Sequence, residues 1–124
     1  MPILDRKALR PVLQTAPTTL PAETFQNNTL RPVLKLQHEL LLATFRHYLT
    51  KRKVRWQSMP KAAFREKTEN LLTRDNRLRG LLFGMVVGMF DNAELDYYLA
   101  NESAVNRRIT SMLTKRVING LLPS

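Results

Sequence analysis

The sequence contains no cysteine, which excludes disulfide bonds and thiolate metal sites. A chain without cysteine suits a reducing compartment, so we expect a cytoplasmic protein. Histidine is also scarce, because only His38 and His47 are present. On one helix these two side chains point to opposite sides and cannot share a metal ion. With no HExxH, ExxH or Cys/His spacing anywhere, we expect neither a metal nor a cofactor.

Long apolar runs are missing too. The most apolar stretch, GLLFGMVVGMF, covers only residues 80–90. As a helix it would be about 16 Å long, roughly half of the hydrocarbon core that a membrane span must cross. We therefore expect no membrane partner. The stretch also lacks the Lys or Ser/Thr of a phosphate-binding loop, and no serine stands in a GxSxG context.

Acidic residues are few: ten Asp or Glu stand against twenty Lys or Arg, a net charge of +10. Such a balance favours anionic partners through long-range attraction. Residues 1–56 carry +7, residues 57–90 carry +3, and residues 91–124 are balanced. We accordingly expect the basic surface in the N-terminal half.

Proline divides the chain into two parts. Four of the seven prolines fall in residues 1–24, where they remove backbone donors and fix φ. The sequence thus predicts an extended or partly disordered N-terminal arm over 1–24 and a single helical domain over 25–124. The arm is expected to dock either on the core or on a neighbouring subunit.

Helical periodicity dominates the domain, and strand signals are nearly absent. One long helix is predicted over 28–55, with Asn28 or Thr29 as its cap and Pro32 in its first turn. Further helices are predicted from 58–60 onward, over 76–90 after a restart at Asp75, after the Asp91–Glu94 capping box, and from Asn101 or Ser103 to Gly120. The fold class is therefore an all-α bundle of about five helices.

The 76–90 helix is apolar on every side, which is typical of a helix wholly inside a protein. Its glycines, Gly80, Gly84 and Gly88, each cost about 1 kcal/mol of helix propensity relative to alanine. Close approach of another backbone would offset that cost. The chain's own long helix is the favoured neighbour, and a homodimer interface is the alternative. A buried strand over the same residues also stays possible.

Two basic segments are candidates for anion binding. The run KRKVRW places Lys51, Arg52, Lys53 and Arg55 beside Trp56, which suits phosphate contact and base stacking in single-stranded nucleic acid. Cations at a helix C-terminus also have a structural explanation, since they complement the helix dipole. Arg107 and Arg108 lie early in the last helix, where the dipole disfavours them, and require a carboxylate such as Glu102 or Asp96, or an external anion.

A second set of polar residues falls on apolar helix faces. His47 projects onto an apolar flank of the long helix, which favours a hydrogen-bonded core histidine over a catalytic base. Asn106 and Arg116 project onto the apolar stripe of the last helix. Buried polar groups need partners, so these two are expected to form a network with Tyr97 and Tyr98.

The segments FQNNTLRPVLKLQ, KRK, LRGLLFGMVVGMF and YYLANESAVNRRI resemble a family of short bacterial all-helical proteins of unassigned function. The resemblance covers roughly residues 25–118. Some members carry a glyoxalase label, which implies a βαβββ metalloenzyme with His and Glu ligands on strands. This sequence departs from that pattern, so no catalytic residue is carried over.

Two functions remain open on the sequence. The preferred one is a small non-enzymatic module that binds nucleic acid or an acidic protein through its basic residues. Such a module could also form a homo-oligomer through the N-terminal arm or the glycine face. The alternative is a small helical enzyme or ligand-binding protein with an inter-helical pocket near His47, Asn106 and Arg116.

Overall fold

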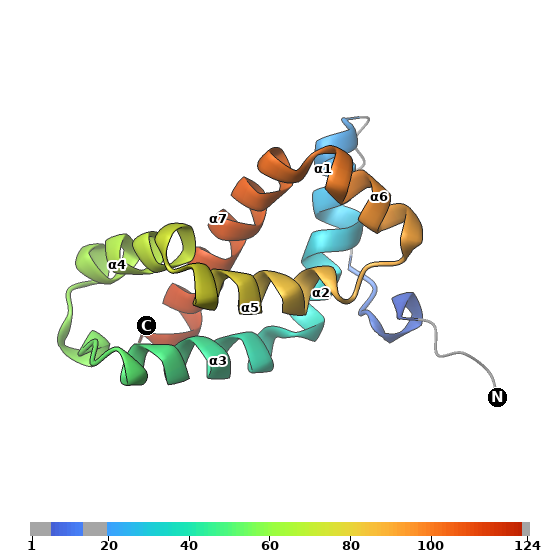
Figure 1. Ribbon diagram of the computed structural model, residues 1–124. Coiled ribbons are helices and arrows are strands. Elements are labelled where there is room, and N and C mark those ends of the chain that lie inside the picture. Colours follow the sequence, from blue (N-terminus) through green and yellow to red (C-terminus); the bar gives the residue numbers. More distant parts are fainter. Residues whose placement is uncertain (1–5, 14–19, 123–124) are drawn as a thin grey trace.

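The computed structural model describes residues 6–13 and 20–122, and these contain helices and turns but no strand (Figure 1). The all-α bundle that the sequence predicts is therefore present. The helices are α1 (Pro21–Phe25), α2 (Arg31–Leu36), α3 (His38–Lys51), α4 (Lys61–Arg74), α5 (Asn76–Val87), α6 (Asn92–Ala100) and α7 (Glu102–Leu121).

The first helical run differs from the predicted long helix 28–55. It begins at Pro21 and passes through a π-helical turn, Gln26–Leu30, into α2. Pro32 explains the π turn, because proline lacks the N–H and its ring crowds the carbonyl four residues earlier. The predicted cap at Asn28 or Thr29 is wrong, since both residues lie inside this continuous run. Thr29 instead donates its hydroxyl to Glu94, 2.8 Å away.

A bend at Gln37 separates α2 from α3. The backbone there has φ −92° and ψ 4°, and the side-chain amide donates to the Met85 carbonyl of α5 at 3.2 Å. The bend sends α3 along a new direction beneath α5 (Figure 1). It ends at Lys51, not at residue 55, and Lys53 follows with a positive φ of 57°.

The remaining helix boundaries follow their caps. Asp75 accepts from the Leu78 backbone N–H at 3.1 Å and opens α5. Asp91 and Glu94 form the predicted capping box of α6. The final helix, however, runs to Leu121 with Gly120 inside it, so the prediction that Gly120 ends the helix is wrong.

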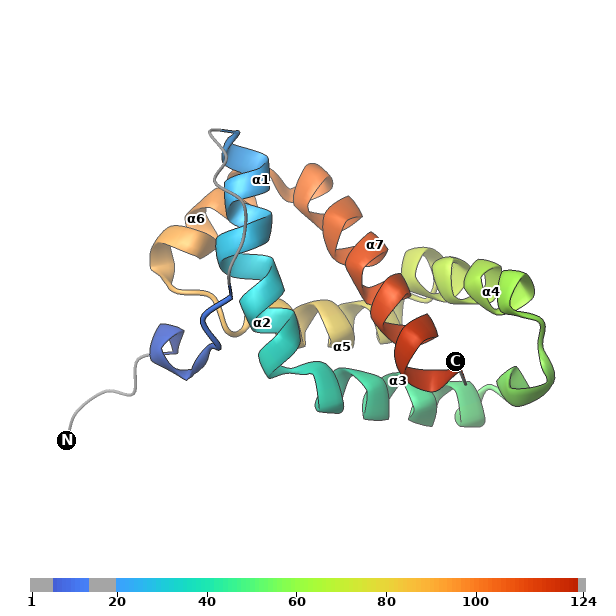
Figure 2. The same ribbon diagram turned by 180° about the vertical axis from the view of Figure 1, so that it is seen from behind.

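The core lies where α7 packs on α3 and α4, while α5 packs on α3 and α4. Views from opposite sides place α5 in front in Figure 1 and α7 in front in Figure 2, so these two helices lie on opposite faces of the bundle. The largest fully buried side chains come from α2, α3, α4, α5 and α7, with one from the π turn: Phe45, Phe64, Leu30, Leu34, Leu49, Leu72, Leu78, Leu82, Ile109, Leu113, Ile118 and Val33.

The glycine face of α5 is exposed, which contradicts the expectation of a helix wholly inside the protein. Gly80, Gly84 and Gly88 are all solvent-accessible, and Leu81 beside them is 45% exposed. No heavy atom of another segment lies within 4 Å of a Cβ built on Gly80 or Gly84. The opposite side of α5, with Leu78, Leu82 and Val86, carries the contacts to the core. An apolar sequence on every side therefore did not require burial on every side.

Part of the predicted arm is anchored to the bundle. Residues Lys7–Leu9 form a 3-10 turn, and α1 already includes residues 21–24; residues 1–5 and 14–19 of the arm lie outside the described part. Arg10 forms a two-pronged ion pair with Glu94 of α6 at 2.7 and 2.8 Å. Both side chains are almost fully buried, at 4% and 8% exposure.

Candidate nucleic-acid interface

One side of α7 is buried and the other carries cations. Residues spaced three or four apart, such as Val105, Ile109 and Leu113, face the core. On the other side, exposed or half-buried residues recur at the same spacing: Ala104, Arg107, Arg108, Ser111, Lys115, Arg116 and Asn119. Figure 2 shows α7 in front, between the α1–α2 run and α4. Three hollows lie around α7: the first is shared with α4 and α5, another is shared with the first helical run and α3, and a small one lies on α7 itself.

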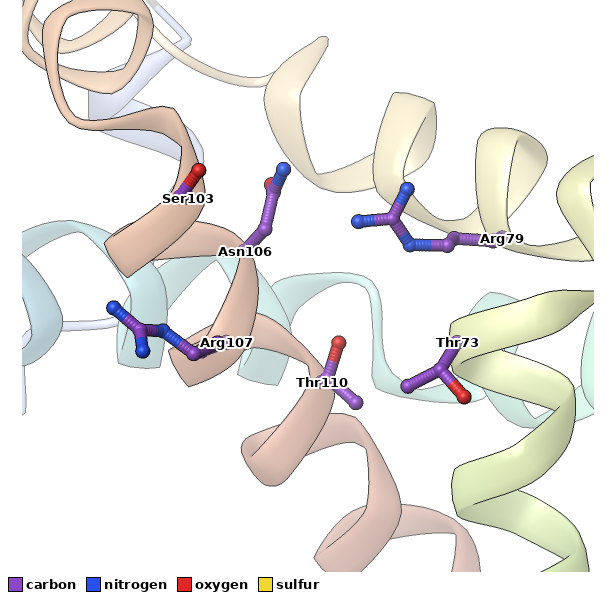
Figure 3. A pocket seen from close by; sticks show the side chains of 6 residues that line it. All are labelled: Thr73, Arg79, Ser103, Asn106, Arg107 and Thr110. Carbon is purple, nitrogen blue, oxygen red and sulfur yellow. The ribbon is translucent and has the colours of Figure 1, made fainter.

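The first hollow, of about 490 Å³, opens between the N-terminal half of α7 and the α4–α5 junction. It is lined by Thr73, Arg79, Ser103, Asn106, Arg107 and Thr110. In Figure 3 the Arg79 guanidinium extends from α5 toward Asn106, whereas Arg107 points to the far side of α7. Arg79 is held by its stacking on the Phe83 ring, 4.6 Å from the ring centre.

Hydrogen bonding orients the Asn106 amide in this hollow. The Tyr98 hydroxyl donates to Asn106 Oδ1 at 2.7 Å, so the amide nitrogen keeps both of its N–H donors for other partners. Burial raises the pKa of Tyr98, as does the nearby charge of Glu102, and the hydroxyl stays a donor at neutral pH. Of the expected network of Asn106 and Arg116 with Tyr97 and Tyr98, only the Tyr98–Asn106 bond is present, because Arg116 contacts His38 instead.

The hollow at the other end of α7, which we call the His38 hollow, also has a volume of about 490 Å³. Arg116 lies within it, with one guanidinium nitrogen 3.0 Å from His38 Nδ1. A guanidinium has donors only, so Nδ1 accepts and the ring proton is on Nε2. Burial lowers the pKa of Arg116, and repulsion from Arg31 lowers it further. The hollow is lined by Gln26, Arg31, His38, Met112, Lys115, Arg116, Asn119 and Gly120.

A small hollow of about 340 Å³ lies between these two, lined by Ala104, Arg107, Arg108 and Ser111. Arg108 donates to Gln26 Oε1 at 2.5 Å and so bridges α7 to the first helical run. The carboxylates expected as partners, Glu102 and Asp96, make no ion pair with Arg107 or Arg108 within the described ranges. No Asp or Glu lines any of the three hollows.

The run KRKVRW is partly used inside the fold. Arg52 forms an ion pair with Asp75 and lies over the Tyr48 ring, which ties the end of α3 to the start of α5. Trp56 is half-buried against Phe64, with ring centres 6.1 Å apart. Only part of its ring is therefore exposed for stacking. Exposed cations remain at Lys51, Lys53 and Arg55.

The predicted inter-helical pocket is divided between different places. His47 is exposed on α3 and contacts the Tyr48 ring, so it is not a core histidine. Tyr97 stacks on Phe25 at 4.6 Å. Asn106 lines the first hollow and Arg116 the His38 hollow. The apolar flank on which the sequence places His47 is exposed to solvent, because Leu36 and Leu40 on that flank are exposed.

Four ionisable residues of the hollows were not among the site candidates from the sequence: Arg31, His38, Arg79 and Lys115. Only Lys115 carried a local signal, because it follows Arg108 and Ser111 at helical spacing. The others come from α2, α3 and α5, and no local pattern relates them to α7.

Among the described residues, no group of three or more His, Cys, Asp or Glu could hold a metal ion. Likewise, no helix in 6–13 or 20–122 is long and apolar enough to cross a membrane. Searches of protein-family models, curated proteins and solved structures give no match to this chain. The resemblance to a family of short bacterial proteins therefore stays a prediction.

Proposed function

We propose that this protein is a non-enzymatic module that binds single-stranded nucleic acid along the basic face of α7. We define the α7 basic face by its six cations: Arg31, Arg79, Arg107, Arg108, Lys115 and Arg116. The observation that carries the proposal is the set of three hollows around α7 that are lined by these cations and, among the described residues, by no Asp or Glu. Half-buried guanidinium groups without carboxylate partners favour an external anion, because burial of an uncompensated charge is costly.

The length of the face suits a chain of phosphates. Ser103 and Asn119 line the outermost hollows, and sixteen residues of helix rise separate them, about 24 Å. A single strand laid along the face can therefore place several successive phosphates beside it. Neutral donors between the cations, including Ser111 and Asn106, supply further hydrogen bonds to phosphate oxygens.

The position of α7 favours a single strand over a duplex. A recognition helix must project from its domain to enter the major groove, whereas α7 lies between the α1–α2 run and α4 (Figure 2). Cations that recur along a helix contact the phosphate backbone rather than base edges. We therefore expect little sequence preference and a strong dependence on salt.

The test is fluorescence anisotropy with a labelled oligonucleotide of about twelve nucleotides. The plot of log affinity against log salt should have a slope of about −4, because each of six phosphate contacts contributes about −0.7 for single strands. Replacing the exposed pair Arg107→Gln and Lys115→Gln should make the slope smaller by about 1.4 and weaken binding at least tenfold. Absence of binding at about 50 mM salt would dispose of the proposal.

A matched control separates this face from net charge alone. The double variant Lys51→Gln, Lys53→Gln removes two exposed cations from the other candidate segment. It should weaken binding less than threefold. Equal losses in both double variants would mean that only total charge matters. Poly-glutamate that binds as tightly as an oligonucleotide of equal charge would favour an acidic protein as the partner.

A further inference from the structure

The His38 hollow is more basic than the first hollow. It contains the formal cations Arg31, Lys115 and Arg116, while the first hollow has Arg79 and Arg107. The His38 ring adds an Nε2–H donor, because Nδ1 is occupied by the guanidinium of Arg116. The Asn119 amide completes the lining. Three cations around one hollow suit an anion that carries more than one charge.

The first helical run, α3 and α7 meet at this hollow. The helix α3 packs against α7, and His38, its first residue, lines the hollow. A Cβ built on Gly120 would lie 2.4 Å from a methyl carbon of Leu42, so the two helices touch without a gap. A strand that lies between α7 and the first helical run and extends toward the C-terminus of α7 therefore meets α3 at the His38 hollow.

We propose that the His38 hollow binds a phosphate monoester at the end of the nucleic-acid strand. This inference rests on the proposed function and specifies its ligand. A monoester carries a charge of about −1.5 to −2 at neutral pH and three free oxygens, whereas an internal diester carries a single charge and two free oxygens. The three cations and the His38 and Asn119 donors match the monoester, and the two arginines of the first hollow match a diester.

The experiment compares oligonucleotides of one sequence with a 5′-phosphate, with a 3′-phosphate, or with hydroxyls at both ends. One of the two phosphorylated forms should bind at least tenfold more tightly than the hydroxyl form. The form that does so shows which end of the strand, 5′ or 3′, occupies the His38 hollow. In the Arg116→Gln variant this ratio should fall below about twofold, while the hydroxyl form still binds.

Two further variants keep this test independent of folding defects. Lys115 is exposed, so Lys115→Gln should lower the ratio without affecting the thermal unfolding midpoint. Lys61 is exposed at the start of α4, outside the three hollows. Its Lys61→Gln variant removes the same charge and should leave the ratio unchanged. A ratio that falls equally in both variants would overturn the assignment to the His38 hollow.

A second readout uses the two histidines of the chain. Adenosine monophosphate should shift the ring resonances of His38 in the NMR spectrum, while those of His47, exposed elsewhere on α3, stay in place. Adenosine, which lacks the phosphate, should shift neither.

The outcomes distinguish the two proposals. Hydroxyl-ended strands that bind as well as both phosphorylated forms would overturn the monoester site and leave the nucleic-acid function standing. A His38 shift with adenosine monophosphate, but no binding of any oligonucleotide, would do the reverse. If neither strand binding nor the shift is observed, both proposals fail.

Discussion

Replacing Gly80 and Gly84 with alanine should stabilise this protein. Both residues lie inside α5 without a positive φ, and a Cβ at either position would meet no heavy atom of another described segment within 4 Å. Alanine exceeds glycine in helix propensity by about 0.8–1 kcal/mol, and it also lowers the entropy of the unfolded chain. We expect each substitution to raise the free energy of unfolding by about 0.5–1 kcal/mol.

Gly88 provides the contrasting position in the same face. A Cβ there would lie 2.8 Å from the Gly84 carbonyl oxygen, which is a backbone atom of the same helix end. The backbone must shift to accept it, so Gly88→Ala should leave stability unchanged or lower it. The three glycines are equivalent in the sequence pattern, and only their surroundings separate them.

Urea unfolding followed by far-ultraviolet circular dichroism measures these effects, since the midpoint moves while the slope stays constant. For a chain of this length, 1 kcal/mol corresponds to about 4 °C in the thermal midpoint. The Gly80→Ala, Gly84→Ala double variant should thus melt about 4–8 °C higher than the wild type. An unchanged or lower midpoint would refute the reasoning.

Sedimentation of the wild type and the double variant separates the two roles that the glycines could have. If the glycine face joins two subunits, as the sequence also allowed, the wild type should sediment as a dimer and the double variant should dissociate more readily. If the glycine face is only exposed to solvent, the wild type and the double variant should have the same mass in solution, and only the free energy of unfolding should rise in the variant. Gly80 and Gly84 line none of the three hollows, so nucleic-acid affinity should not change in either case.

Other predictions concern the buried polar groups. Thr68 is fully buried, and its hydroxyl lacks a hydrogen-bond partner within the described residues; Thr68→Val should raise the unfolding free energy by about 1 kcal/mol, and a loss would indicate a hidden partner. Arg10→Met should cost about 3–5 kcal/mol because it leaves the Glu94 carboxylate buried and unpaired. Burial alone raises the pKa of Glu94, but bonds from Arg10, the Asp91 N–H and Thr29 outweigh it and lower the pKa below its ordinary 4.5. The contribution of Glu94 to the free energy of unfolding should therefore be complete above pH 4.5 and should decline as the pH falls through the lower folded-state pKa. The decline should be weaker in Arg10→Met. Chemical unfolding at several pH values measures both.

Local sequence was sufficient for most of the secondary structure. The Asp75 cap, the Asp91–Glu94 capping box and the apolar spacing of α7 act within one or two turns of helix, so they are visible in the residues themselves. The π turn before Pro32 and the bend at Gln37 were missed. A helix can absorb a proline or bend in several ways, and contacts with other segments, such as the bond from Gln37 to α5, select one.

The sequence by itself determined an all-helical chain, its excess of positive charge and the apolar side of each helix. Only the tertiary structure decided which helix faces are exposed to solvent, because burial depends on neighbours that come from distant parts of the chain. The glycines of α5 were expected inside and lie outside, while Arg52 and Trp56 were candidates for anion binding and instead contact Asp75 and Phe64. Arg31, Arg79 and Arg116 come from three separate helices, and only the tertiary packing places all three beside α7.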